Sequence, residues 1–194
     1  RSRFAPVPWS TKPAFEAVSL RNWEPNYRID AIVRAFAQVR QQIPQARLHL
    51  LGGGSQDGLL RALVQELSRQ NSVQLHGRLH DARMAAVLAR CKLSVSVPDG
   101  DATSVSVLES MACGLAVIAS DLPANRAWLA PDALVPVGDV DALAARWLAL
   151  LRDDARAAAL GARNAERIAR EGDRRVQMDA MDAAYRRLLA EARR

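Results

Sequence analysis

The sequence predicts an α/β fold in which helices cover both faces of a doubly wound parallel sheet. Short apolar runs alternate with segments whose apolar residues recur at helical spacing. Such alternation is typical of parallel sheets built from βαβ units. The chain has 194 residues, of which 49% are hydrophobic and 25% charged, which is enough to enclose one core and excludes disorder for most of its length.

Six short apolar runs are the strand candidates, and polar or glycine-containing segments separate them. In chain order they are residues 15–20, 46–51, 73–76, 92–97, 116–119 and a short sixth run, Leu134–Val135. The segment in front of them contains three prolines and is predicted to be an extended lead-in. We therefore divide the chain into a lead-in or linker, residues 1–14, and one domain, residues 15–194.

Helical spacing of apolar residues follows most of these runs. Helices are predicted over residues 29–39, 59–67, 82–90, 105–111, 141–151, 155–170 and Arg174–Ala192. The apolar side chains at positions 59, 60, 63, 64 and 67 are expected to share one buried face of the second helix. Asp81 is expected to cap the third helix and Gly114 to end the fourth. The last helix mixes Arg with Asp and Glu, which predicts a solvated amphipathic helix.

Charge and cysteine content exclude several classes of protein. The net charge of +6 comes from 27 Lys and Arg against 21 Asp and Glu, but the arginines do not form an aromatic-rich patch, so no nucleic-acid partner is expected. No apolar stretch approaches the roughly 20 residues of a membrane-spanning helix. Two cysteines without metal-ligand spacing favour a reducing, cytoplasmic compartment. The chain begins Arg-Ser-Arg without Met or a signal-peptide pattern, which suggests a piece of a longer protein.

The loop after the fourth strand carries the strongest candidate site. Ligands of doubly wound sheets bind at the carboxyl ends of the strands, where the strand order reverses. Unpaired N–H groups at the helix start, Ser104–Ser106, would attract an anion. Asp101 and Glu109 flank this anion site, and two carboxylates suit a hydroxyl-rich ligand. Two other interpretations stay open: Asp99 and Asp101 cap the helix while Glu109 is a surface charge, or the two aspartates hold a divalent metal.

These residues resemble a known motif. Asp101, seven intervening residues and Glu109, followed by Ser-Met-Ala-Cys-Gly and an apolar strand, resemble the donor motif of GT-B glycosyltransferases of the retaining group 1 family, which has Glu at both positions. Matching segments at residues 18–21, 46–54, 73–78 and 135–139 extend the resemblance from residue 15 to the C-terminus. It implies a Rossmann-like donor-binding domain with additional C-terminal helices. It also implies an N-terminal acceptor domain, which is absent from this chain.

The resemblance also implies the roles of individual residues. Glu109 would hold ribose hydroxyls, Asp101 hydroxyls of the transferred sugar, and Arg21 the diphosphate; these three are the predicted catalytic residues. The other predicted donor-binding positions are Gly52, Gly53 and Gly54 near the phosphates, Arg78 and Leu79 beside the base, Ser104, Val105 and Ser106 facing the diphosphate, and Arg28 as a second cation.

Two positions depart from the family pattern. Asp101 is one methylene shorter than the usual Glu, which we interpret as a change of specificity. Tyr27 occupies the place of a phosphate-binding Lys, and the neighbouring Arg28 is the candidate substitute. Adjacent helical residues point about 100° apart, so this substitution puts diphosphate binding in doubt. Stacking of Tyr27 on a base or sugar is a further interpretation.

The sequence therefore predicts the donor-binding half of a glycosyltransferase that uses a nucleotide sugar, retains the anomeric configuration, and needs neither metal nor cofactor. The predicted partners are the nucleotide-sugar donor, a sugar or lipid-linked acceptor, and the absent N-terminal domain, with activity in the cytoplasm or at the inner face of a membrane. The isolated chain is expected to bind donor and to be inactive in transfer. The alternatives are a nucleotide-sugar epimerase of the same fold and a catalytically silent binding module.

Overall fold

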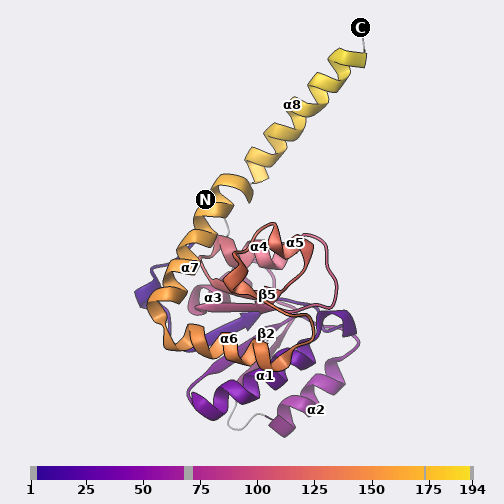
Figure 1. Cartoon of the computed structure of the whole chain (residues 1–194). Coiled ribbons are helices and arrows are strands. Elements are labelled where there is room, and N and C mark those ends of the chain that lie inside the picture. Colours follow the sequence, from indigo (N-terminus) through magenta and orange to yellow (C-terminus); the bar gives the residue numbers. More distant parts are fainter. Residues whose placement is uncertain (1–3, 68–71, 173, 193–194) are drawn as a thin grey trace.

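A computed structural model describes residues 4–67, 72–172 and 174–192. Its centre is a six-stranded, fully parallel sheet with the order β3-β2-β1-β4-β5-β6 (Figure 1). The strands are β1 (Glu16–Ser19), β2 (Arg47–Leu51), β3 (Val73–Gly77), β4 (Leu93–Ser96), β5 (Ala116–Ser120) and β6 (Leu134–Val135). Each lies within one residue of its predicted limits, so the strand predictions and the doubly wound α/β fold are confirmed.

Helices follow the strands in chain order. They are α1 (Ile29–Gln42), α2 (Asp57–Leu67), α3 (Asp81–Arg90), α4 (Val105–Ala112), α5 (Pro123–Arg126), α6 (Val140–Arg152), α7 (Asp154–Arg167) and α8 (Arg174–Ala192). Short turns of 3₁₀ helix are η1 (Trp9–Thr11), η2 (Pro25–Tyr27) and η3 (Pro131–Ala133), and η4 (Ile168–Gly172) is a π-helical turn. Of these helices, α5 was not predicted, because four residues are too few to show a period.

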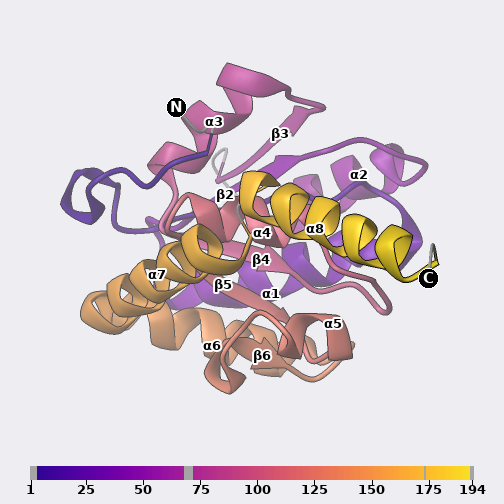
Figure 2. The same ribbon diagram turned by 90° about the horizontal axis from the view of Figure 1, so that it is seen from above.

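The two faces of the sheet are covered by different helices. Phe36 of α1, Leu60 of α2 and Trp147 of α6 belong to one buried cluster, together with Ile118 of β5. Its neighbour Val117 points the opposite way and packs with residues of α4, as the alternation of side chains along a strand requires. Figure 1 shows the strands lying between these helical layers, and Figure 2 looks onto the sheet from the side of α4. Burial on both faces explains why the strands read as continuous apolar runs.

Two local predictions are wrong. Asp81 is the first residue of α3 and not its cap, since His80, with extended backbone, holds the cap position. Leu59 is exposed and does not share the core-facing side of α2, on which Leu60 and Leu63 are buried and Val64 and Leu67 pack against the core. The predicted end of α4 is confirmed, because Gly114 adopts a φ of 68° just after it.

The lead-in packs against the domain. Lys12 is buried, and its ammonium group donates to the carbonyl oxygens of Cys91 at 3.0 Å and Cys113 at 3.4 Å. The indole of Trp9 donates to Asp154 at the start of α7. Residues 1–3 of the lead-in lie outside the described residues. The described lead-in therefore contacts the segments that precede β4 and β5, through Lys12, and the start of α7, through Trp9.

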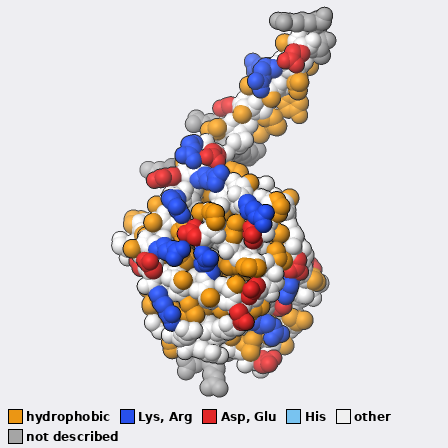
Figure 3. Space-filling model, viewed as in Figure 1, with side chains coloured by type: hydrophobic (Ala, Val, Ile, Leu, Met, Phe, Trp, Pro, Cys, Tyr) orange, Lys and Arg blue, Asp and Glu red, His pale blue; other side chains and the backbone are white. Residues whose placement is uncertain are grey.

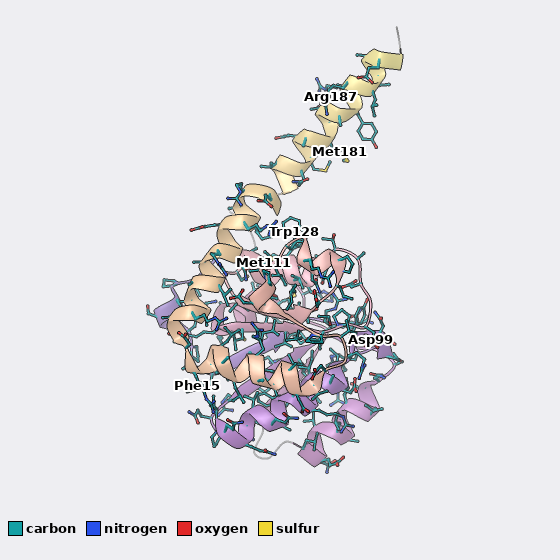
Figure 4. All side chains as sticks on the ribbon, in the orientation of Figure 1. Phe15, Asp99, Met111, Trp128, Met181 and Arg187 are labelled. Carbon is teal, nitrogen blue, oxygen red and sulfur yellow. The ribbon has the colours of Figure 1, made fainter. Side chains whose placement is uncertain are left out.

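The last helix extends away from the domain. Figure 1 shows α8 projecting beyond the sheet and its helices, and Figure 3 shows hydrophobic atoms along it. Met181 and Arg187 lie on this projecting part, whereas Trp128 lies near its base (Figure 4). Its exposed apolar side chains include Met178, Tyr185 and Leu188, which confirms a solvent-exposed helix. Within the described part of the chain, no helix is both long and apolar enough to cross a membrane.

The strand order locates the point at which ligands bind in such sheets. β1 pairs with β2 on one side and with β4 on the other, so the chain changes direction across the sheet between β1 and β4. The carboxyl ends of these two strands lead into the segments 20–28 and 97–104. A ligand crevice is expected where these two segments meet.

Candidate functional site

Arg21 connects the two segments at the switch point. Its guanidinium donates from Nη2 to Asp101 Oδ2 at 2.8 Å, and from Nη1 to the hydroxyl oxygens of Ser104 and, at 3.1 Å, Ser106. The side chain of Arg21 is only 8% exposed and that of Asp101 20% exposed. Arg21 is thus in direct contact with three other residues predicted to bind donor, which lie about 80 positions further along the chain.

The start of α4 presents backbone N–H groups beside this guanidinium. Ser104 caps the helix, and its hydroxyl accepts from the amide of Val107 at 3.4 Å. The interpretation that Asp99 and Asp101 cap this helix is therefore wrong. The first amides of a helix carry partial positive charge, and the side chain of Val105 points into solvent there. The combination of Arg21 and these amides suits an anion with several oxygens.

Tyr27 lies against Arg21. The guanidinium carbon sits 4.1 Å from the centre of the Tyr27 ring, a cation–π arrangement. The ring thus covers the face of Arg21 and restricts its movement. The ring partner of Tyr27 in the structure is Arg21, and stacking of Tyr27 on a base or sugar stays a prediction.

Arg28, the predicted second cation, has acidic partners of its own. It donates to Asp99 at 3.0 Å and to Asp30 at 3.4 Å. The hydrogen bond that Arg28 donates to Asp99 raises the pKa of Arg28 above its usual value. Arg28 precedes α1 with a left-handed backbone, φ 49°, and it lines a groove of about 750 Å³ between α1 and α2. Arg28 and Arg21 therefore form ion pairs with different carboxylates of the same loop, Asp99 and Asp101.

The same contacts bear on the alternative metal site at Asp99 and Asp101. Each of the two carboxylates is paired with a guanidinium, that of Arg28 for Asp99 and that of Arg21 for Asp101. Asp99 lies on the loop at the margin of the domain (Figure 4), where its amide donates to the carbonyl of Asn26. Two neighbouring positive charges oppose the binding of a divalent cation there.

The glycine turn after β2 packs directly on the segment that carries Arg21. A Cβ on Gly52, whose φ is 148°, would collide with the carbonyl oxygen of Arg21. A Cβ on Gly54 would collide with Glu24 and with the backbone of Trp23. The turn is held by hydrogen bonds from Trp23 N to Gly53 O at 3.1 Å and from Gln56 N to Trp23 O at 2.9 Å. The close approach that these glycines allow is therefore an approach between two loops of the protein.

Sequence reasoning missed Trp23 and Glu24 as supports of the site. Trp23 is buried, and the carboxylate of Glu24 accepts from the amide of Ser55 at 3.0 Å and from its hydroxyl. These hydrogen bonds lower the pKa of Glu24 below its usual value. The polar turn that contains both residues gave no sign of this role, because their partners lie about 30 positions away.

A cavity of about 340 Å³ lies beside the glycine turn. Arg78 and Leu79, the positions predicted to border a base, line it together with Leu20, Gly52 and His80. Glu109 lies in the second turn of α4 and is half-buried. The predicted base-binding and phosphate-binding positions therefore follow the carboxyl edge of β3, β2, β1 and β4 in turn.

A second cluster of titratable side chains lies on the α3 side of the sheet. His49 contacts His76 at 2.9 Å between Nδ1 and Nε2, and contacts Glu16 at 3.2 Å between Nε2 and Oε2. Arg90 donates twice to Glu16, at 2.8 and 3.1 Å. Burial would raise the pKa of Glu16, but the hydrogen bond and charge of Arg90, with His49, lower it below its usual value. Burial lowers the pKa of both histidines, and each ring has the other as neighbour.

This cluster is also the group of residues nearest to a metal-ligand arrangement in the described ranges. Potential ligand atoms of Glu16, His49 and Cys91 lie within 4.8 Å of one another, and all three residues are buried. Burial strongly raises the pKa of the Cys91 thiol, and metals bind the thiolate. Glu16 and His49 already have protein partners. The donor set therefore fits an internal hydrogen-bond network better than a metal ion.

Comparison with known proteins gives the family. Residues 16–153 match the family of glycosyl transferases group 1. The chain belongs to the group 1 glycosyltransferases. Among its relatives are an exopolysaccharide phosphotransferase of Streptomyces coelicolor, 31% identical over 88% of this chain and 18% of that protein, and a phosphatidyl-myo-inositol mannosyltransferase of Mycolicibacterium smegmatis, 32% identical over 76% of this chain and 38% of that protein.

The fold of this group 1 family member agrees with that assignment. The sucrose-phosphate synthase of Thermosynechococcus elongatus superimposes with a TM-score of 0.86 at 27% identity, over 97% of this chain and 50% of that one. The fold is that of the C-terminal domain of GT-B glycosyltransferases, which confirms the family resemblance. The chain spans less than half the length of the two curated relatives.

Proposed function

We propose that this chain binds a nucleotide sugar and forms the donor half of a retaining glycosyltransferase. The observation that carries the proposal is the convergence of Arg21, Asp101, Ser104 and Ser106 at the carboxyl ends of β1 and β4. An anion-binding helix start and a carboxylate lie next to each other there. A nucleotide sugar has the matching groups, a diphosphate followed by a ring of hydroxyls.

Each part of the donor has a counterpart along this edge of the sheet. Arg21 and the first amides of α4 hold the diphosphate, and they stabilise the charge that develops on it as the glycosidic bond to the sugar breaks. Asp101 accepts from sugar hydroxyls, and Glu109, in the second turn of α4, accepts from the ribose. The base enters the cavity beside Arg78 and Leu79, next to the glycine turn. The pairing of Asp99 and Asp101 with arginines supports a mechanism without metal.

The acceptor belongs to the part of the enzyme beyond this chain. One relative acts, by its name, on phosphatidyl-myo-inositol. This supports a sugar or a lipid-linked sugar as the acceptor, bound by a second domain at the cytoplasmic face of a membrane. Transfer then requires both halves, so the 194-residue chain alone binds donor and does not catalyse transfer.

A donor-binding module without catalysis is the second candidate. It is favoured by one observation: Arg28 forms ion pairs with Asp99 and Asp30. Tyr27 stands where the family resemblance implies a lysine. A single arginine then faces the diphosphate. Transfer assays on the chain joined to its preceding domain separate the two candidates, because only the enzyme forms glycosylated product.

Calorimetry in excess EDTA tests donor binding. The chain is titrated with UDP, GDP, ADP and their sugar-linked forms. Nucleotides of one of the three bases are expected to bind. A charge-assisted hydrogen bond contributes about 1.5–3 kcal/mol, so Arg21→Gln should weaken diphosphate binding about tenfold or more. Arg126→Gln is the control, since Arg126 forms an exposed ion pair with Asp121 after β5. Binding that needs a divalent ion would contradict the metal-free mechanism, and failure of every nucleotide would contradict the function itself.

A further inference from the structure

The pairing of Arg21 with Asp101 has a consequence for ligand selection, which rests on the proposed function. Nη2 of Arg21 donates to Asp101 Oδ2 at 2.8 Å, while Nη1 serves Ser104 and Ser106. Both terminal nitrogens of the guanidinium therefore have protein partners. A diphosphate that binds Arg21 is a second anion beside the same cation, and it competes with the Asp101 carboxylate.

Asp101 is the partner that gives way in this competition. The ring of Tyr27 covers one face of the Arg21 guanidinium, and the hydroxyls of Ser104 and Ser106 accept hydrogen bonds from it. The side chain of Arg21 is almost completely buried. Asp101 lies on the loop before α4, and its next two neighbours, Ala102 and Thr103, are exposed. The carboxylate can therefore leave Arg21, which its contacts with Tyr27, Ser104 and Ser106 hold in place.

A displaced Asp101 needs new hydrogen-bond donors. Its side chain is only 20% exposed, so water replaces the lost arginine incompletely. A charged group left without partners in such a place is costly. Sugar hydroxyls are donors and supply what the carboxylate loses. A nucleoside diphosphate without sugar supplies none and leaves two anions facing one cation.

We propose that Asp101 competes with the diphosphate for Arg21 and thereby determines specificity. It selects nucleotide sugars over free nucleoside diphosphates, because only a nucleotide sugar offers hydroxyls to which the Asp101 carboxylate can bind in place of Arg21. The exchange runs forward when a donor binds, because the diphosphate takes Arg21 and the sugar takes Asp101. It reverses once the sugar has left. Asp101 then returns to Arg21 and promotes release of the nucleoside diphosphate.

Asp101→Asn separates this competitor from a simple binding residue. The variant keeps the shape of the side chain and removes its charge. Binding of the nucleoside diphosphate is expected to become about tenfold tighter, since one of two competing anions is gone, while binding of the nucleotide sugar weakens. Inorganic pyrophosphate, which has neither base nor sugar, should also bind more tightly. Asp101→Ser, which removes the same charge and shortens the side chain, should likewise tighten binding of the nucleoside diphosphate and weaken binding of the nucleotide sugar.

Asp121→Asn is the matched control. Asp121 follows β5 at the same edge of the sheet and pairs with Arg126, so its variant removes one negative charge without changing the partners of Arg21. It should bind both ligands like the parent. Equal weakening of both ligands by Asp101→Asn, or unchanged affinity for the diphosphate, overturns the competition while donor binding by the parent stands. Absence of nucleotide binding by the parent overturns the proposed function and this inference together.

Discussion

Tyr27 shows how one residue can replace another without repeating its chemistry. The family resemblance implies a lysine at this place, and the tyrosine contributes an aromatic face to Arg21. A cation held against an aromatic ring loses conformational freedom, so fewer orientations of the guanidinium remain to be fixed when an anion binds. Arg28, the adjacent positive charge, is paired with Asp99 and Asp30, and its role as a second cation for the diphosphate stays a prediction.

Tyr27→Leu should therefore weaken nucleoside diphosphate binding. Loss of a partly buried cation–π contact of about 0.5–2 kcal/mol corresponds to roughly a two- to thirtyfold drop in affinity. Tyr27→Phe keeps the ring and should bind like the parent. Calorimetry with the diphosphate, and with the uncharged nucleoside as a reference, distinguishes the two variants. If Phe is as harmful as Leu, the hydroxyl and not the ring is the important group.

Glu109→Gln tests the ribose contact at the same scale. The substitution keeps the shape and removes the charge, so affinity for the nucleoside diphosphate should fall about tenfold. Inorganic pyrophosphate lacks the ribose, and its affinity should stay the same. The comparison needs only two titrations of one folded variant. A parallel loss for pyrophosphate would show that Glu109 acts on the phosphates or on the fold of α4.

At the scale of elements, two loops position the site by packing on each other. The segment after β1 carries Arg21, and the glycine turn after β2 fits beneath it with no room for a side chain at Gly52. The start of α4 comes from a third element, which Arg21 joins through Ser104 and Ser106. A change in the packing of the glycine turn should therefore displace Arg21 and weaken binding of the diphosphate.

Gly52→Ala should lower both stability and diphosphate affinity. The new methyl group would collide with the Arg21 carbonyl, and the φ of 148° is unfavourable for alanine, which together cost roughly 1–3 kcal/mol. Urea unfolding measures the first effect and calorimetry the second. Gly58→Ala is the control: Gly58 lies in α2 with nothing near its Cβ position, and alanine there should stabilise by about 0.5–1 kcal/mol. Equal stability of the Gly52→Ala variant and the parent would contradict the packing argument.

At the scale of the whole molecule, the network of Glu16, His49, His76 and Arg90 ties three strands to α3 and contributes pH-dependent stability. The pKa of both histidines is lowered in the folded protein. Between that lowered pKa and the ordinary value of about 6.5, the unfolded chain binds more protons than the folded one. Stability therefore falls as the pH drops below about 6.5. The lowered pKa of Glu16 adds a second loss at more acidic pH, as its carboxylate takes up a proton.

The double variant His49→Gln, His76→Gln should show a flatter dependence of stability on pH between 7 and 5. Its free energy of unfolding, measured in urea at each pH, should be lower than that of the parent near pH 7, because the internal hydrogen bonds are weakened. His80→Gln removes an exposed histidine outside the network and should keep the slope of the parent. An unchanged slope in the double variant would assign the pH dependence to other groups.

The sequence by itself determined the order of strands and helices, the helix start at Ser104, and the loop that carries Asp101. These features depend on neighbouring residues: apolar runs that are buried on both faces, a hydroxyl that caps its own helix, and glycines that end or turn a segment. It also indicated Arg21, Asp101 and Glu109 through their resemblance to a family motif. Spacing along the chain was sufficient for the strands and helices, whereas the roles of these three residues depended on the resemblance.

The tertiary structure alone decided which of these groups are partners. Arg21 pairs with Asp101 and lies against Tyr27, Arg28 pairs with Asp99, and the glycine turn supports Arg21. Arginine offers several donors on a long side chain, and which acceptors they meet depends on how strands about 80 positions apart are brought side by side. A local sequence pattern cannot show which of these distant residues become neighbours. The physical reason is that charge pairing is decided by position in space, whereas strands and helices are largely decided by position in the chain.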